Sequence, residues 1–212
     1  ILAVHSQGRS KDQIWSALKN KNVYGTSGPR ILLWFDIINS PDGTQPMGSE
    51  ITMSQNPKFI VRAAGSFKQK AGCPVESIDS LSSERLEYLC AGECYNPSNK
   101  RHLIERIEII KITPQEYAGE AISPLIQDAW RTLPCFGESE CVVEFEDENY
   151  SRDSVYYVRA IQQGTLAING GKGIGGKDFK LCRGSFRTDL SDDCLEMDNE
   201  RAWSSPIYLN KP

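Results

Sequence analysis

The sequence lacks several features that would assign it to a common functional class. It has only two histidines, His5 and His102, and no pair of cysteines separated by two residues, so a tetrahedral zinc site is hard to assemble. No hydrophobic run approaches the length of a membrane-spanning helix. Basic residues are not in excess, because the formal net charge is -4 and the pI is about 5.3. We therefore expect neither nucleic acid nor a membrane as a partner, since an anionic partner is bound through a basic surface.

The composition is that of a soluble globular protein. Hydrophobic residues make up 39% of the 212 residues and the mean hydropathy is -0.43, which suits one large domain or one domain with an additional segment. The chain begins with the short apolar segment Ile1–Val4, which resembles a strand with nothing before it. We therefore expect a longer gene product, of which these residues are the C-terminal part.

The seven cysteines lie in segments rich in glycine, proline and polar residues. They are Cys73, Cys90, Cys94, Cys135, Cys141, Cys182 and Cys194. Cysteines in loops at short separations indicate disulfides and an oxidising compartment, so we predict a periplasmic or secreted protein. Cys135 with Cys141 and Cys182 with Cys194 are the preferred pairs, because each pair would close one short loop.

The other three cysteines are predicted to form one further disulfide. Cys73 pairs with either Cys90 or Cys94, which leaves one thiol unpaired. Sequence alone does not fix the connectivity. A zinc site is the alternative interpretation of these cysteines.

A short helix and a shaped turn precede the first long strand. Ser10 followed three residues later by Gln13 is a capping box, which predicts that a helix begins after Ser10. Residues 25–29 contain two glycines and a proline, which indicates a tight turn. The apolar segment Ile31–Ile38, in which only Asp36 is charged, predicts a buried strand. We therefore place a domain boundary between residues 30 and 31.

The predicted helix carries an apolar stripe. Ile14, Trp15, Ala17 and Leu18 recur at helical spacing, so they are expected to face a partner surface. We interpret Trp15 as a core residue, although a chain that starts at Ile1 need not contain all of that surface.

Strands separated by turns dominate the remainder. The expected strands are Lys58–Ala64, Leu103–Ile112, Cys141–Glu146, Val155–Gln162 and Trp203–Leu209. Residues 74–100 and 163–200 are expected to be long connectors stapled by cysteines. Because no strand–helix–strand alternation occurs, the sequence predicts a mainly β protein with an antiparallel β-sandwich.

Two segments at opposite ends of the chain carry a recognisable pattern. In the first, the matching residues are Ala3, Val4, Arg9, Ile14, Trp15, Ala17, Leu18, Lys19, Tyr24, Thr26, Ser27, Gly28, Pro29, Arg30 and Ile31. The second joins residues 156–160 (YYVRA) to residues 201–207 (RAWSSPI). Both resemble a family of uncharacterised bacterial proteins, a domain-of-unknown-function branch of the PHP (polymerase and histidinol phosphatase) superfamily of metal-dependent hydrolases.

The resemblance implies an architecture and an activity. Residues 1–30 would be the last strand and helix of an α/β-barrel catalytic domain, and residues 31–212 an accessory β-sandwich. Enzymes of this superfamily hold two or three metals through several histidines and carboxylates, and a metal-bound hydroxide attacks a phosphoester. Zinc or manganese is thus implied for the full-length protein. Two histidines cannot build such a centre, so no metal and no catalysis are expected of this chain alone.

The implied partner is the protein's own missing N-terminal catalytic domain, and the surface left by its absence is expected to favour a non-native dimer.

His5 follows a short strand at the rim of the implied barrel, so it is the one candidate metal ligand; the alternative is a histidine whose ring nitrogens are hydrogen-bonded to backbone or water. Arg9 and Arg30 are candidates for contact with an anionic substrate, or for ion pairs with Asp12 or Asp36. His102 is interpreted as a surface residue.

Two further patterns are weak. Gly171, Gly173 and Gly176 have the spacing of a dinucleotide-binding loop, but no helix pattern follows them, which favours a plain loop. An acidic run lacks the spacing of an EF-hand calcium-binding loop and is interpreted as solvated; it comprises Asp189, Asp192, Asp193, Glu196, Asp198 and Glu200.

The competing functional class is an envelope binding module, in which the disulfide-stapled sandwich holds a glycan, calcium or a protein partner.

Overall fold

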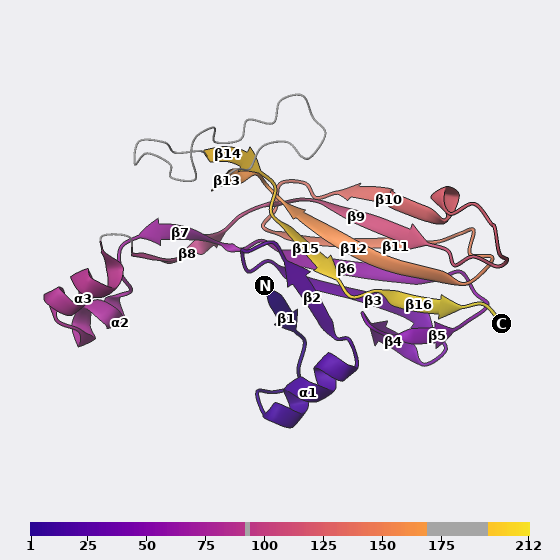
Figure 1. The fold of residues 1–212 in the computed structure, drawn as a ribbon, viewed down its shortest axis with the longest axis horizontal. Coiled ribbons are helices and arrows are strands. Elements are labelled where there is room, and N and C mark those ends of the chain that lie inside the picture. The colour runs from indigo at the N-terminus through magenta and orange to yellow at the C-terminus, as the bar shows by residue number, and fades with distance from the viewer. Residues whose placement is uncertain (92–93, 169–194) are drawn as a thin grey trace.

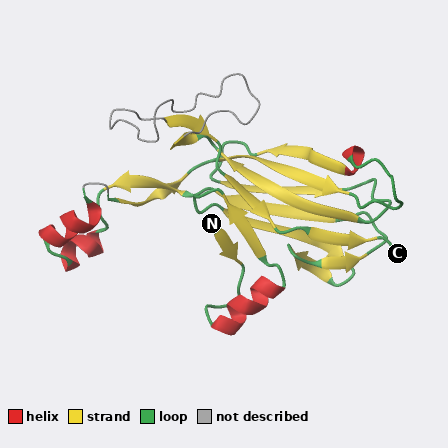
Figure 2. Cartoon of the chain, viewed as in Figure 1, coloured by secondary structure: helices red, strands yellow, loops and turns green. Residues whose placement is uncertain are grey.

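The structure is a computed structural model that describes residues 1–91, 94–168 and 195–212. It is mainly β, as predicted, and its strands form several antiparallel sheets (Figures 1 and 2). The strands are β1 (Leu2–Val4), β2 (Val23–Thr26), β3 (Leu32–Ser40), β4 (Gly43–Pro46), β5 (Glu50–Thr52), β6 (Lys58–Ala64), β7 (Phe67–Ala71), β8 (Tyr95–Arg101), β9 (Ile104–Ile112), β10 (Ile126–Pro134), β11 (Glu140–Glu146), β12 (Ser154–Gln162), β13 (Thr165–Ile168), β14 (Leu195–Asp198), β15 (Arg201–Ser204) and β16 (Ile207–Asn210). The helices are α1 (Lys11–Lys19), α2 (Val75–Ser80), α3 (Ser83–Cys90) and the 3-10 turn η1 (Ser123–Leu125).

The larger sheet is built around β12. On one side, β12 pairs with β9, which in turn pairs with β10. On its other side, β12 pairs with β15 at one end and with β16 at the other. From β15 the sheet continues through β2 to β1, and from β16 it continues to β5, the one parallel neighbour in this sheet. Strand β1 is therefore at the edge of the larger sheet.

The smaller sheet has the order β11-β6-β3-β4 and packs against the larger one in a sandwich-like arrangement. Strand β3 alternates in burial as a half-covered strand should, with Leu33, Phe35 and Ile37 fully buried. From the other sheet, Tyr156 and Val158 are also fully buried. Side chains of both sheets thus form one shared core, which supplies the main driving force for folding.

Aromatic rings fill the centre of this core. The ring centroids of Phe59 and Phe145 are 4.9 Å apart, and those of Phe35 and Phe59 are 5.4 Å apart. Tyr156 of the opposite sheet approaches Phe59 at 4.9 Å, and Trp130 approaches Tyr156 at 6.1 Å. These separations are in the favourable range for offset or tilted aromatic pairs, so the two sheets are joined largely through rings.

The first 30 residues form a strand–helix–strand unit, β1–α1–β2, attached to the sandwich. Helix α1 begins with the predicted capping box, in which the Ser10 side chain accepts from the Gln13 amide and Gln13 accepts from the Ser10 amide. The Nδ2 of Asn22 donates to the carbonyl of Met47 at 2.9 Å. A Cβ on Gly48 would lie 2.5 Å from the carbonyl oxygen of Asn20, so only glycine permits this close approach.

The pairing of β2 with β15 bridges the predicted boundary at residues 30 and 31. Gly25 is opposite Trp203 in this pairing, so the unit and the sandwich share one sheet. That residues 1–30 also belong to a preceding barrel stays a prediction.

A narrow arm extends away from the sandwich at one end (Figure 1). It consists of the two-stranded sheet β7–β8 with the helices α2 and α3 between its strands. The sequence predicted only a connector for residues 74–100, and this prediction is wrong for α2, α3 and β8. These helices have six and eight residues and bury no side chain, so they leave little hydrophobic periodicity in the sequence. The connector predicted for residues 163–200 is also wrong at its two ends, where β13 pairs with β14.

The other strand predictions are confirmed within a residue or two, with one exception. Residues 203–209 were predicted as one strand, but the structure divides them into β15 and β16 at Ser205 and Pro206. Proline has no amide hydrogen for the ladder, so the pairing with β12 stops at β15 and resumes at β16. The predicted glycine loop and half of the acidic run (Asp189, Asp192 and Asp193) lie outside the described residues.

Candidate functional site

The β1–α1–β2 unit places His5 at the junction between the unit and β3. The His5 amide donates to the carbonyl of Asn22 at 2.8 Å, directly after the last pair of the β1–β2 ladder. Its Nε2 lies 2.8 Å from the carbonyl oxygen of Leu33. A carbonyl can only accept, so Nε2 carries the hydrogen and a neutral imidazole presents Nδ1 as an acceptor. The ring also lies 5.2 Å from the ring of Tyr24 and 5.7 Å from that of Trp34.

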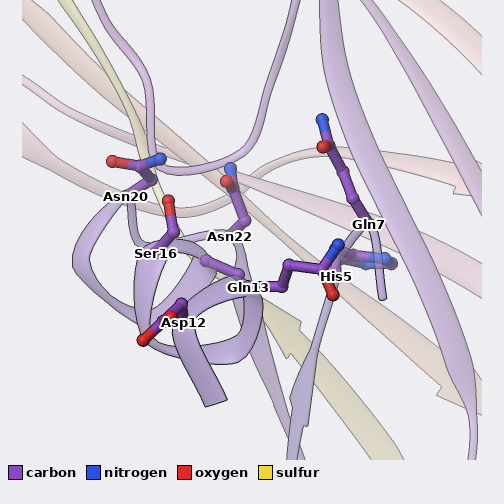
Figure 3. Close-up of a pocket in the computed structure, with 8 residues that line it drawn as sticks. His5, Gln7, Asp12, Gln13, Ser16, Asn20 and Asn22 are labelled. Atoms are coloured by element: carbon purple, nitrogen blue, oxygen red, sulfur yellow. The ribbon is translucent and has the colours of Figure 1, made fainter. Parts of the chain in front are cut away.

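A polar hollow of about 320 Å³ opens beside His5 (Figure 3). Its lining side chains come from the segment after β1, from α1 and from the loop before β2; they are His5, Gln7, Asp12, Gln13, Ser16, Ala17, Asn20 and Asn22. A second hollow, of about 350 Å³, also touches His5 and is lined on its far side by Trp34, Asp36 and Met47. His5, Gln7 and Asn22 line both hollows, and His5 is the one titratable side chain among them.

The hollows offer too few ligands for the implied metal centre. His5 resembles a metal-binding histidine in one respect, because such histidines commonly donate their second ring nitrogen to a backbone carbonyl. However, in the part of the chain that the structure describes, the one group of three or more closely spaced potential metal ligands consists of cysteines on the arm. Around His5, the residues present do not fit a two-metal hydrolase site.

Arg9 and Arg30, the other candidates, are both exposed. The sequence suggested ion pairs with Asp12 or Asp36, but within the described residues neither arginine forms one. Asp36 instead pairs with Arg62 of the adjacent strand β6 at 3.1 Å. The strand pairing explains the difference, because it brings Arg62 and Asp36 to neighbouring positions on the outer face of the smaller sheet.

Apolar side chains of the β1–α1–β2 unit face solvent. Ile1 is 64% exposed, Leu2 60%, Ile14 38% and Trp15 58%. The interpretation of Trp15 as a core residue is therefore wrong. Helix α1 lies outside the sandwich (Figure 2), and Ala17 is its one buried residue, so the described chain provides no layer to cover the stripe.

The sequence did not predict a buried polar network in the core. The ammonium of Lys111 contacts Asp147, and the hydroxyl of Tyr156 donates to the same carboxylate oxygen at 2.5 Å. The amide of Asn149 donates to the other oxygen at 3.0 Å. Burial opposes ionisation of Asp147, but these donors together hold its pKa below the ordinary value. The pKa of Tyr156 is raised, first by burial and then by its bond to Asp147. Both carboxylate oxygens of Asp147 are paired and the network lies within the core, so we assign it a structural role.

His102 is half-buried and not a surface residue as predicted, and its Nδ1 has no partner within the described residues. Burial, with a smaller contribution from the positive charge of Lys68, lowers the pKa of His102. Its carbonyl oxygen would lie 2.0 Å from a Cβ on Gly65, which explains the glycine there. The tight packing at Gly65 fixes the backbone where the arm begins.

The structure joins Cys135 and Cys141 in a disulfide, the pairing preferred from sequence. Cys182 and Cys194 lie outside the described residues. Cys73, Cys90 and Cys94 come together on the arm, where the sulfur of Cys94 contacts both of the others. No helix in the described ranges has both the length and the apolar character needed to span a membrane.

Residues 1–71 match a protein-family model described as a protein of unknown function (DUF3604). The match covers 71 of the 212 residues and continues across the predicted boundary at residue 30. No curated protein and no solved structure matches the chain. The similarity thus supports the part of the resemblance that concerns a family of unknown function, while the PHP superfamily stays a hypothesis.

Proposed function

We propose that this chain is the C-terminal accessory portion of an exported metal-dependent hydrolase, and that the β1–α1–β2 unit contacts a preceding catalytic domain. The observation that carries the proposal is the exposed apolar surface of this unit. Leu2 and Trp15 are each more than half exposed, on two elements that emerge from the same sheet edge. A group of exposed apolar side chains on one surface is typical of a site that a partner covers in the complete assembly.

The edge position of β1 adds a second means of contact. Strand β1 pairs with β2 on one side, and no described strand pairs with its other side. An unpaired strand edge accepts another strand through backbone hydrogen bonds. A strand of the catalytic domain would therefore extend the sheet while its side chains cover Ile1 and Leu2.

In this proposal the zinc or manganese ligands lie mainly in the preceding domain. His5 would then be positioned at the contact, with its Nε2 held by the carbonyl of Leu33 and its side chain at the edge of the two hollows. The Cys135–Cys141 disulfide supports export, because disulfides of this kind persist in oxidising compartments.

The experiment compares Trp15→Lys with the matched control Tyr117→Lys in the full-length gene product. Tyr117 is 65% exposed, similar to Trp15, but lies in the loop before η1. We expect Trp15→Lys to lower both the thermal midpoint and the manganese-dependent hydrolysis of p-nitrophenyl phosphate, and Tyr117→Lys to leave both unchanged. Equal behaviour of the two variants would contradict the proposal, as would hydrolysis by residues 1–212 alone.

A protein-binding module is the second candidate function, and the arm favours it. Its helices expose Val75 (66%), Tyr88 (78%) and Leu89 (55%). A protein partner fits this surface better than a glycan does, because the exposed side chains are largely aliphatic and the exposed Trp15 is on a different element. Removal of residues 74–91 would abolish partner binding under this alternative, and would leave hydrolysis by the full-length protein unchanged.

A further inference from the structure

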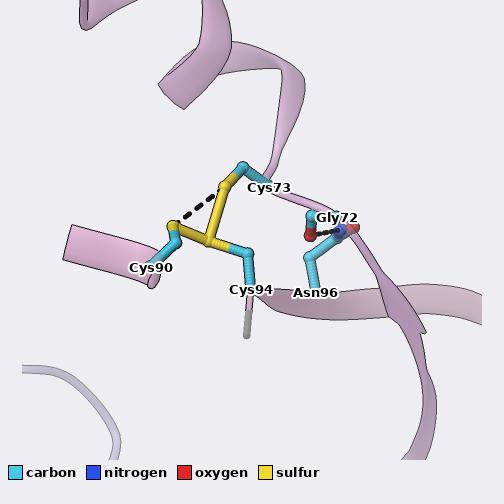
Figure 4. Close-up of a disulfide and its surroundings, with 5 residues drawn as sticks. All are labelled: Gly72, Cys73, Cys90, Cys94 and Asn96. Atoms are coloured by element: carbon cyan, nitrogen blue, oxygen red, sulfur yellow. Dashed lines mark hydrogen bonds between the residues drawn. A yellow bond between two sulfur atoms is a disulfide. The ribbon is translucent and has the colours of Figure 1, made fainter. Parts of the chain in front are cut away.

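Three cysteines meet where the arm's strands give way to its helices (Figure 4). Cys73 follows β7, Cys90 is the last residue of α3, and Cys94 precedes β8. The Gly72 amide donates to the carbonyl of Cys94 at 2.8 Å, and the Asn96 side chain donates to the carbonyl of Gly72 at 2.6 Å. These bonds hold the ends of β7 and β8 together, so the positions of Cys73 and Cys94 are fixed by backbone contacts.

The third cysteine is positioned by the end of helix α3. Ala91 adopts a left-handed conformation with φ of 44°, and its amide donates to the carbonyl of Glu87. This cap ends the helix at Cys90. The sulfur of Cys90 thereby lies 3.0 Å from that of Cys73, and all three sulfurs lie within 4.8 Å of one another.

The backbone geometry allows two different disulfides. The Cα atoms of Cys73 and Cys94 are 5.2 Å apart, and those of Cys90 and Cys94 are 5.0 Å apart. Both separations fall within the range of about 4.4–6.8 Å that disulfides span. One sulfur forms only one disulfide at a time, so among the described residues the third cysteine of the cluster has no disulfide partner and lies in contact with a disulfide.

We propose that Cys73, Cys90 and Cys94 form a thiol–disulfide exchange site. In the exchange, the thiolate of Cys90 attacks the Cys94 sulfur of the Cys73–Cys94 disulfide. The Cys90–Cys94 bond forms, the Cys73–Cys94 bond breaks, and Cys73 leaves as a thiolate, which takes a proton from solvent in place of the one that Cys90 lost. The step is an isomerisation, so it requires no oxidant or reductant.

The two disulfides differ in the segment of chain that each encloses. The Cys73–Cys94 bond spans 21 positions and encloses both helices, so it clasps the base of the helical pair. The Cys90–Cys94 bond spans four positions and leaves that base open, while Cys73 becomes the free thiol. The exchange therefore selects which thiol the arm presents and how firmly α2 and α3 are tied to the strands.

A soft metal ion held by three thiolates is the competing use of the same sulfurs. The exchange site is favoured because the chain also contains the Cys135–Cys141 disulfide, which indicates an oxidising setting where closely spaced thiols form disulfides.

The test is a map of free thiols in the purified, unreduced chain. The protein is quenched in acid, alkylated with N-ethylmaleimide after unfolding, and cleaved by a glutamate-specific protease, which separates Cys90 from Cys94 at Glu93. We expect one alkyl group per cluster, shared between Cys73 and Cys90, with Cys94 and the Cys135–Cys141 pair unlabelled. Label confined to one position would overturn the proposal, as would label on all three, with or without stoichiometric zinc.

Two single variants test separately whether each of the two disulfides can form. Cys90→Ser should retain a Cys73–Cys94 disulfide, and Cys73→Ser should retain a Cys90–Cys94 disulfide. Both should leave the Cys135–Cys141 disulfide intact, which reports that the sandwich is folded. If Cys94 becomes alkylated in Cys73→Ser, the second disulfide does not form and the exchange site is refuted.

Discussion

The sandwich and the β1–α1–β2 unit both carry regularly spaced apolar side chains, but they bury them to opposite extents. Phe35, Phe59 and Val158 in the sandwich are 0% exposed, whereas Leu2 and Trp15 in the unit are 60% and 58% exposed. The difference lies in the second layer, which each sheet of the sandwich provides for the other and which no described element provides for α1. Apolar periodicity thus identifies the face that requires a partner, and only the fold shows whether the partner is present.

The largest contrast is expected from truncation of one aromatic side chain in each region. Phe59→Ala removes a ring that contacts Phe35, Phe145 and Tyr156, so it should lower the free energy of unfolding by about 3–5 kcal/mol. Trp15→Ala in the same chain should change it by less than about 0.5 kcal/mol. Urea unfolding followed by circular dichroism measures both values, and similar losses would remove the distinction between the regions.

The buried ion pair of the sandwich should be almost as sensitive. Asp147→Asn leaves the ammonium of Lys111 buried without its counter-charge, so we expect a loss of about 3–5 kcal/mol. The double variant Asp147→Asn with Lys111→Met should recover part of that loss, because it removes the unpaired charge. Urea denaturation curves of the two single variants and the double variant test both expectations. If the loss in the double variant equals the sum of the two single losses, the coupling is refuted.

The Asp147 carboxylate should make the stability of the sandwich depend on pH. The pKa of Asp147 is lowered in the folded state, so its contribution is complete above the ordinary value of 3.8 and is lost as pH falls through the folded pKa. The wild-type chain should therefore lose stability below about pH 4 more steeply than Asp147→Asn does. Thermal midpoints measured from pH 7 to pH 3 provide the comparison, and parallel profiles would contradict it.

The smallest effect should be confined to the β1–α1–β2 unit. Ser10→Ala removes the helix cap, which typically contributes about 1 kcal/mol to a helix. Because α1 buries only Ala17, we expect faster hydrogen exchange in residues 11–19 with little change in the global thermal midpoint. A fall in the midpoint as large as that of Phe59→Ala would show that the unit and the sandwich unfold as one.

The parts that could be predicted from the sequence are those governed by local rules. The capping box predicted the start of α1, and apolar runs rich in β-formers predicted the strands β3, β6 and β12. The missed features depend on contacts between distant residues. Lys111 was indistinguishable from a solvated strand lysine until Asp147 was placed beside it. A lysine flanked by Ile110 and Ile112 was the one available sign.

The candidate site was predicted less completely than the fold. His5 was identified from its position after a strand, and the structure adds the carbonyl of Leu33 that fixes its ring. The expected ion pairs of Arg9 and Arg30 are absent from the described residues. For Asp36 the reason is the pairing of β3 with β6, which places Arg62 beside it. The convergence of Cys90 and Cys94 with Cys73 depends on the turn after α3, which sequence spacing alone does not reveal.

Protection of the β1–α1–β2 unit in the full-length gene product tests the central proposal most directly. Hydroxyl-radical labelling of Trp15 and Leu2 would be compared between residues 1–212 and the full-length product, with Tyr117 as the internal reference. The proposal predicts that labelling of Trp15 and Leu2 falls several-fold in the full-length product while that of Tyr117 stays the same. Equal labelling in the two proteins would show that nothing covers this surface and would contradict the proposed role.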